Sequence, residues 1–183
     1  MKHSLAAVGL LLVAGAALPS PIMAQVPSGK DVVAPSAYAS FDPVARGAAF
    51  QVAVIMKIRP GFHVNAREVT EDYLIRTDLR AELPAGFKAG EVIYPKGTLQ
   101  TFSFSKNKPL NVYTDSVTLF VPVTALGDAP AGTQHLPLKL RYQACSAEIC
   151  LPPVTLSLDV PLNVATTAGA ARPAHPEVFS LRK

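Results

Sequence analysis

Residues 136–162 read LPLKLRYQACSAEICLPPVTLSLDVPL, two apolar runs joined by a loop that holds both cysteines of the chain. Apolar residues occupy every second position on each side of the loop: Leu136, Leu138, Leu140 and Tyr142 before it, and Val154, Leu156, Leu158 and Val160 after it. A period of two is typical of a half-buried β-strand. We therefore predict two partner strands, with Cys145 and Cys150 at the two ends of the connection between them.

The same alternation occurs elsewhere in the chain. It is clearest in residues 48–58 and 116–126, and shorter strand-like runs at 73–83, 90–97, 98–105 and 110–113 are broken by Pro and Gly. Turn signals about every ten residues, with no amphipathic helix, are typical of a sandwich. The 17 prolines suit turns and edge strands better than helix interiors. We predict an all-β fold, an immunoglobulin-like β-sandwich.

The two ends of the chain differ in composition from its middle. Residues 1–24 have a basic start, an apolar run and a small-residue ending, so we expect a cleaved secretory signal peptide. Residues 25–36 are expected to be a flexible leader, 37–162 the folded domain, and 163–183 a flexible tail. The signal implies export, which permits disulfides, but its pattern does not separate the periplasm from the exterior.

Charge and composition argue against some classes of partner. The formal net charge is only +4, and no block of Lys or Arg is present, so we expect no nucleic-acid partner. No phosphate-binding Gly-rich loop and no Gly-x-Ser-x-Gly motif occurs. The sequence gives no sign of a cofactor.

The cysteine pair leaves three roles open on its spacing alone. A structural disulfide would close a ring of about six residues, which stabilises a fold by only about 2 kcal/mol. Redox exchange needs a short-range pair that opens and closes without unfolding, with an accessible sulfur. A Cu(I) site of both thiolates with His63 is the third role, although a zinc site would want more ligands.

Several stretches resemble one known family. YQACSAEICLPP (142–153) is similar to the active-site loop of the N-terminal periplasmic domain of the thiol:disulfide interchange protein DsbD family. IRPGFHVNA (58–66), EVIYPKG (91–97) and SVTLFVPV (116–123) resemble supporting segments of that family. The resemblance covers residues 37–162, nearly the whole predicted domain, and the cysteine motif is its most specific part.

The resemblance implies an immunoglobulin-like fold, a periplasmic location and a redox-active cysteine pair. By position, Cys150 would form the mixed disulfide with partners and Cys145 would resolve it. The implied activity is that of a protein-disulfide reductase component, which takes electrons from a membrane donor of the DsbD or CcdA type, or from thioredoxin-like proteins, and passes them to oxidised periplasmic proteins. Two competing readings are a non-enzymatic immunoglobulin-like interaction module with a structural disulfide and a copper-handling domain.

The resemblance also suggests residues around the cysteines. Tyr142, Gln143, His63 and Asn65 are expected beside them, and His63 is a candidate to stabilise the Cys150 thiolate. A loop that shields the sulfurs would fall in residues 91–104, with Ile93, Tyr94, Phe102 and Phe104 as candidates. This chain departs from the family in its four-residue spacer, one shorter than in the best-known members. It also lacks the membrane and thioredoxin-like domains of the full-length protein, so we expect a stand-alone form.

Overall fold

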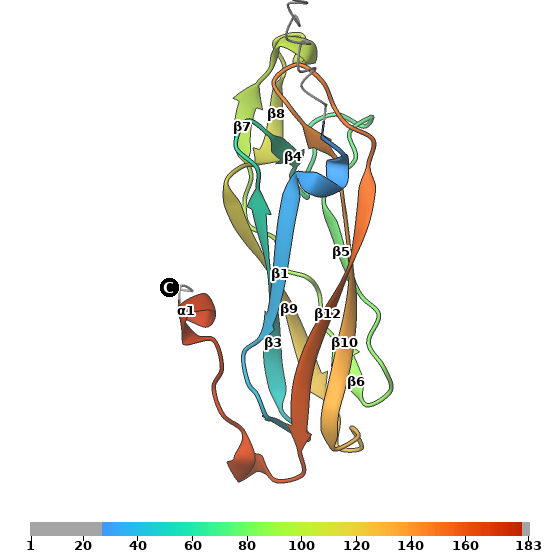
Figure 1. The fold of residues 1–183 in the computed structure, drawn as a ribbon, viewed down its shortest axis with the longest axis vertical. Coiled ribbons are helices and arrows are strands. Elements are labelled where there is room, and N and C mark those ends of the chain that lie inside the picture. Colours follow the sequence, from blue (N-terminus) through green and yellow to red (C-terminus); the bar gives the residue numbers. More distant parts are fainter. Residues whose placement is uncertain (1–26, 181–183) are drawn as a thin grey trace, which may run out of the picture.

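The computed structural model describes residues 27–180, and the predicted signal peptide lies outside them. Two long antiparallel sheets face each other and form an immunoglobulin-like β-sandwich (Figure 1). The first sheet has the order β1-β3-β9-β6. Its strands are β1 (Val33–Ala39), β3 (Ala49–Ile58), β9 (Ser116–Ala125) and β6 (Phe87–Ala89). The predicted fold class is confirmed.

The second sheet has the order β2-β12-β10-β5, in which only β2 and β12 run parallel. Its strands are β2 (Val44–Ala45), β12 (Val154–Ala165), β10 (Gly132–Tyr142) and β5 (Asp78–Ala81). β10 and β12 are the partners predicted from the sequence, and Tyr142 pairs with Val154 directly below the cysteine loop. The loop therefore closes the longest hairpin of the described residues.

A third sheet, β11-β4-β8-β7, lies at one end of the sandwich. Its strands are β11 (Ala144–Cys145), β4 (His63–Asn65), β8 (Pro109–Tyr113) and β7 (Thr98–Thr101). In Figure 1 these strands are at the top, beside the orange loop that carries the cysteines. This small sheet sets the cysteine loop beside segments that are distant from it in sequence.

The core lies between the two long sheets. The inward positions of β3 and β9 predicted by alternation are buried, among them Val52, Met56 and Leu119. A second, smaller cluster of Leu74, Leu110 and Val112 lies under the third sheet, with Phe102 and Phe104 packed against it. The end of the molecule that carries the cysteines thus has a small hydrophobic core of its own.

Three predicted strand regions differ from the prediction, and in residues 98–105 only β7 is a strand, followed by a helical turn at 103–105. In residues 73–83 the strand is limited to β5, since Leu74 instead closes a turn by donating its N–H to the Glu71 carbonyl at 3.1 Å. Residues 90–97 contain no strand, apart from an isolated bridge between Ile93 and Phe120. Helical segments in the described chain are short: η1 (Gly29–Asp31), η2 (Ser103–Ser105), η3 (Ala168–Ala170) and α1 (Pro176–Phe179).

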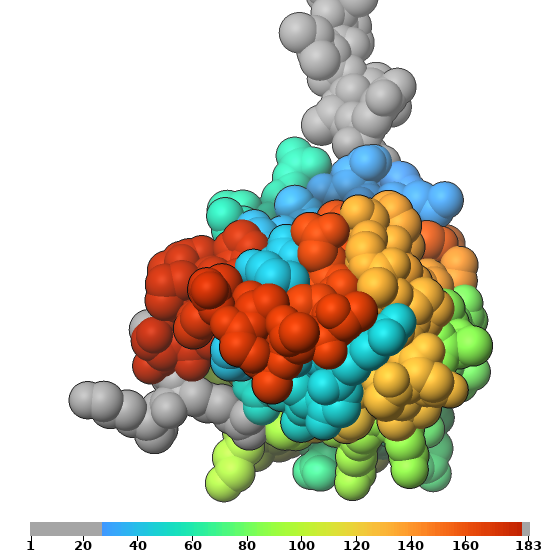
Figure 2. Space-filling model, turned by 90° about the horizontal axis from the view of Figure 1, so that it is seen from below, coloured from blue at the N-terminus to red at the C-terminus, as the bar shows by residue number. Residues whose placement is uncertain are grey.

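The strands extend past both predicted domain boundaries. β1 begins at Val33, four residues before the predicted start, and Val33 pairs with Ile58. β12 continues to Ala165, and beyond it the Ala174 N–H donates to the Ser40 carbonyl at 2.9 Å. The segment after β12 begins at the end of the molecule opposite the cysteine loop, seen in red in Figure 2, and returns beside the first sheet to α1 (Figure 1). Backbone pairing, which composition does not reveal, holds both segments to the sandwich.

Candidate functional site: the cysteine loop

Cys145 and Cys150 form a disulfide across the loop between β11 and β12. Cys145 is the last residue of β11, and the two cysteines also form an isolated antiparallel bridge, with Cα atoms 3.9 Å apart. Beside them the Leu151 N–H donates to the Ala144 carbonyl at 2.8 Å. The pair therefore closes a tight hairpin at the end of the stiff β10–β12 ladder.

The two cysteines differ sharply in exposure. Cys145 has an exposed fraction of 0%, whereas Cys150 and the three residues before it are exposed. Among those three, Ile149 presents an apolar side chain that is 48% exposed. Cys150 and Ile149 therefore form part of the surface of the loop, while Cys145 lies beneath it.

Ser146 shapes the four-residue spacer. Its hydroxyl accepts hydrogen bonds from the backbone N–H groups of Glu148 and Ile149, each at 3.2 Å. Its own N–H donates to the Ile149 carbonyl at 2.8 Å. A Ser side chain that accepts from the next backbone N–H groups stabilises a turn. The spacer is thus held as a turn by its own hydrogen bonds.

Gln143 and Asn65 join the base of the loop to its surroundings. The Gln143 amide nitrogen donates to the Leu151 carbonyl at 3.2 Å, and its amide oxygen accepts from the Ile75 N–H and the Asn65 side chain, each at 3.3 Å. The Asn65 amide also donates to the Ile75 carbonyl at 3.1 Å. Both predicted residues therefore lie beneath the cysteine hairpin, in contact with each other.

Tyr142 ends β10 and is fully buried. Its hydroxyl donates to the Gly29 carbonyl at 2.9 Å, which fastens η1 to the sheet next to the loop. Burial raises the pKa of Tyr142 to about 12. The phenol therefore stays protonated. Tyr142 packs in the core and anchors η1, one residue before Gln143.

His63 lies directly beside the buried cysteine. It is the residue of β4 that pairs with Cys145 of β11, and its exposed fraction is 3%. Burial lowers the pKa of His63 from 6.5 to about 4, so the imidazole is neutral at neutral pH. In the disulfide form it therefore carries no positive charge, so the charge that the sequence suggested for stabilising the Cys150 thiolate is absent from this state.

Two of the four shielding candidates reach the site. The ring of Phe102 stacks on the His63 imidazole, with centroids 3.9 Å apart and planes 12° apart, and the ring of Phe104 lies 6.3 Å from it. Ser103, between them, donates its hydroxyl to the Ala147 carbonyl in the cysteine loop at 2.8 Å. Residues 102–104 thus lie over the imidazole and contact the spacer. Ser103 was not identified from the sequence, since an exposed serine gives no distinctive signal.

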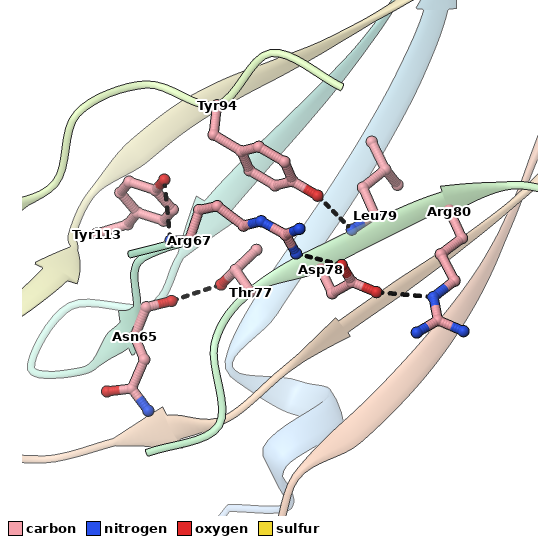
Figure 3. Close-up of polar contacts among 8 residues, drawn as sticks. All are labelled: Asn65, Arg67, Thr77, Asp78, Leu79, Arg80, Tyr94 and Tyr113. Carbon is pink, nitrogen blue, oxygen red and sulfur yellow. Dashed lines mark hydrogen bonds and ion pairs between the residues drawn. The ribbon is translucent and has the colours of Figure 1, made fainter. Parts of the chain in front are cut away.

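Ile93 and Tyr94, the other two candidates, lie elsewhere. Ile93 is held by paired backbone hydrogen bonds to Phe120 in β9. The Tyr94 hydroxyl accepts a hydrogen bond from the Leu79 N–H at 2.9 Å, at the free edge of β5, and its ring lies over the Arg67 guanidinium at 4.9 Å (Figure 3). Neither residue has a contact with the cysteine loop among those of the described chain.

A polar network joins β4 to β5 below the site (Figure 3). The Arg67 guanidinium bonds to the Asp78 carboxylate, which also accepts from Arg80 at 2.8 Å. Burial tends to raise the pKa of Asp78, but the hydrogen bonds from Arg80 and Arg67 outweigh it and lower that pKa below 3.8. Arg67 and Asp78 line a hollow of about 1060 Å³ between β5 and β8. Their charges are mutually paired, a pattern that sequence reasoning missed.

No three His, Cys, Asp or Glu side chains within residues 27–180 gather in a way that could hold a metal ion. The copper reading, which would use both sulfurs and His63, therefore gains no support from the geometry. Separately, in the part of the chain that the structure describes, no helix is long and apolar enough to cross a membrane.

The match to a known family covers the cysteine loop. The family described as the N-terminal part of the thiol:disulfide interchange protein DsbD matches residues 29–162, which include both cysteines and every strand from β1 to most of β12. No curated protein matches the sequence.

Two solved structures match the chain at low sequence identity. The N-terminal periplasmic domain of ScsB from Proteus mirabilis matches with a TM-score of 0.48 and 12% identity, covering 73% of this chain and 47% of that one. AggA, the major subunit of aggregative adherence fimbriae type I from Escherichia coli, matches with a TM-score of 0.31 and 7% identity, covering 72% of this chain and 96% of that one. The chain thus spans about half of the ScsB structure.

Proposed function

Since this chain belongs to the family of N-terminal domains of the thiol:disulfide interchange protein DsbD, we propose that it is a periplasmic thiol–disulfide exchange domain. In this proposal, Cys145 and Cys150 alternate between disulfide and dithiol and relay reducing equivalents to oxidised periplasmic proteins. The donor is a membrane protein of the DsbD or CcdA type or a thioredoxin-like protein. The chain acts as the protein-disulfide reductase component of such a relay.

The observation that carries the proposal is the unequal exposure of the two sulfur-bearing residues. Exchange begins when a thiolate attacks one sulfur of a disulfide, so one sulfur must be open to a partner and the other must be its leaving group. Cys150 is exposed and Cys145 is buried. This supports the roles in which Cys150 carries the mixed disulfide and Cys145 resolves it.

In the proposed exchange, the partner is reduced and the cysteine pair is oxidised. The Cys150 thiolate of the reduced pair attacks one sulfur of the partner's disulfide, which releases the partner's other sulfur as a thiolate. Cys145 then loses its proton and attacks the Cys150 sulfur, which forms the Cys145–Cys150 bond and releases the partner's second sulfur. The partner gains two electrons and two protons, and the cysteine pair loses them.

The surroundings suit a visiting protein. Ile149 gives an exposed apolar side chain one residue before Cys150, a type of contact that protein interfaces use. The hairpin sits on a paired ladder and on the Gln143 network, so the bond can open while the sandwich stays folded. We therefore place the docking surface on residues 147–150.

Trapping tests the proposal. Cys145→Ser leaves Cys150 without its resolving partner, so it should accumulate a mixed disulfide with oxidised periplasmic proteins, seen as a reductant-sensitive band and identified by mass spectrometry. Cys150→Ser is the matched control, because its remaining thiol is buried and should capture far less. Equal capture by both variants, or none by either, would contradict the proposal.

The reading as a structural disulfide makes a different prediction. A disulfide that only rigidifies the loop should have a reduction potential below about −300 mV and resist the glutathione pool. A relay pair should equilibrate with glutathione or thioredoxin at higher potential. Measuring the oxidised fraction of the intact protein across a glutathione redox series separates the two readings.

A further inference from the structure

His63 shares one face of the third sheet with Cys145. The two residues are register partners in the antiparallel pair β4–β11. Residues directly opposite each other in such a pair have Cβ atoms about 4.5–5.5 Å apart. The imidazole is therefore the neighbour of the Cys145 side chain on the adjacent strand.

The imidazole is enclosed and incompletely bonded. Its exposed fraction is 3%, and Phe102 covers one of its faces. Within the described residues, its Nε2 atom is buried and has no hydrogen-bond partner. An unpaired buried polar atom costs about 1–3 kcal/mol, so its presence calls for a reason. A partner that appears only in another redox state would be such a reason.

Among residues 27–180, no charged group contributes to the pKa of His63. Burial is the one cause that lowers the pKa of His63. The ionisable residue of the spacer, Glu148, is exposed, and after η2 both Lys106 and Lys108 are exposed, with Lys108 paired to Glu71 at 3.0 Å. From β8, the Tyr113 hydroxyl donates to the Pro95 carbonyl at 2.9 Å. The ring is thus neutral, and Nε2 is free to accept a proton.

Cys145 needs a proton acceptor in the resolving step. The thiolate is the nucleophile in exchange, and burial in apolar surroundings raises the pKa of a thiol. Cys145 has an exposed fraction of 0%, so water reaches it poorly. An exposed cysteine ionises with the help of solvent, but this one must release its proton inside the protein.

We propose that His63 is the base of the resolving step: its Nε2 accepts the Cys145 thiol proton as the Cys145 sulfur attacks Cys150 in the mixed disulfide. The bond between Cys145 and Cys150 forms, the bond between Cys150 and the partner breaks, and the partner's sulfur leaves with the electron pair. That thiolate then takes a proton from the imidazolium or from water. The inference rests on the proposed exchange function.

The low pKa of His63 in the disulfide form is compatible with this role. In the disulfide form no negative charge lies opposite the ring. When Cys145 loses its proton, negative charge develops on the sulfur across the strand pair, and a nearby negative charge favours the protonated imidazole. The imidazolium is thus stabilised only while the sulfur is ionised, which is when a base is needed.

The test uses the reduced protein and the reagent 5,5′-dithiobis(2-nitrobenzoate), followed by stopped-flow absorbance. Attack by Cys150 releases a first equivalent of thionitrobenzoate, and ring closure by Cys145 releases a second. His63→Phe keeps a ring for the Phe102 stack but removes both nitrogens. It should slow the second release by about a hundredfold, within the usual contribution of a general base, and leave the first unchanged.

The pH profile separates a base from a merely structural residue. In the wild type the second rate should be nearly flat between about pH 6 and 8, because the proton passes within the protein. In His63→Phe it should rise about tenfold per pH unit, because the thiol must first ionise to solvent. His63→Gln, which accepts a hydrogen bond but not a proton, should behave likewise and serves if His63→Phe folds poorly. His135→Phe, an exposed histidine on β10, is the matched control.

An unchanged second rate and an unchanged pH profile in both variants would overturn the role of His63 and leave the exchange function standing. If the wild type itself releases no second equivalent, the cysteine pair does not cycle, and the proposed function fails together with this inference.

Discussion

Cys145 and Cys150 are joined in one disulfide, yet one lies wholly beneath the surface and the other is open to solvent. The difference arises from the fold: Cys145 ends β11, whose two residues are both buried where this strand pairs with β4, while Cys150 follows the exposed residues 147–149. A disulfide placed in this way joins an exposed residue to a buried one, and the proposed separate roles of the two cysteines depend on that difference.

This asymmetry predicts selective alkylation. Iodoacetamide added to the reduced, folded protein should modify Cys150 at least about tenfold faster than Cys145, since alkylation requires an accessible thiolate. Peptide mass spectrometry over a time course gives the two rates. In urea sufficient to unfold the chain the rates should converge, and equal rates in the folded protein would contradict the burial of Cys145.

The burial of His63 should make the stability of the folded protein depend on pH. Its folded pKa, about 4, is lower than the 6.5 of the exposed imidazole, so the unfolded chain binds the proton more tightly. Stability attributable to this residue is therefore full above about pH 6.5 and falls as the pH drops toward 4. Between pH 7.5 and 4.5 the oxidised wild type should lose about 2–3 kcal/mol more than His63→Phe, measured by urea unfolding. Parallel losses in the two proteins would show that the imidazole is hydrated.

Phe102 should control the pKa of that imidazole. Because burial is what lowers the pKa of His63, removing the ring stacked on it should admit water and raise the pKa from about 4 toward 6.5. Phe102→Ala is therefore expected to shift the titration of the His63 imidazole proton, followed by NMR, toward neutral pH. Leu99→Ala, at an exposed side chain on β7, is the control and should leave the titration unchanged.

Three groups of residues show how much of the structure could be predicted from the sequence. The alternation on both sides of the cysteine loop predicts the β10–β12 pair and the face of each strand that packs against the core, because the pleat of a strand fixes which side chains share a face. On β12, however, Val154, Leu156 and Leu158 are only half-buried. Gln143 and Asn65 were placed near the cysteines by resemblance to the family, and they do meet beneath the hairpin. The stacking of Phe102 on His63 depends on how residues 98–113 fold over β4, and no local pattern encodes that contact.

The incorrect expectations have similar physical causes. Tyr94 and Phe102 are eight residues apart in one segment with the same aromatic character, yet Tyr94 points to the edge of β5 and Phe102 to His63. Sequence spacing locates a loop but not the neighbour that each side chain meets. The ion pair of Arg67 with Asp78 gave no signal in the sequence either, because it forms only when the segment after β4 folds against β5.

The ion pair of Arg67 with Asp78 should stabilise the attachment of β5. Asp78→Asn keeps the shape of the side chain but removes its charge, and we expect a loss of about 1–2 kcal/mol at pH 7, because both partners are only partly buried. The pKa of Asp78 is lowered, so its stabilisation is present above about pH 3.8 and fades as the pH falls further. The difference between wild type and variant, measured by denaturant unfolding, should therefore shrink near pH 3, whereas an equal difference at both pH values would mean that the charge is not responsible.

Gly97 lies where the segment that carries Tyr94 enters β7, and it has no room for a side chain. A Cβ there would lie 2.3 Å from Asn111 Oδ1 and 2.8 Å from the Ala66 Cβ, both in the region that supports the third sheet. Gly97→Ala should therefore destabilise the protein by about 1–3 kcal/mol, the usual cost of forcing extra volume into a packed site. Gly127→Ala is the matched control, because a Cβ at Gly127 meets nothing within 4 Å, and its unfolding midpoint should stay close to that of the wild type. If the two variants unfold at the same denaturant concentration, the close packing of residues 97, 66 and 111 is not what holds the third sheet against the sandwich.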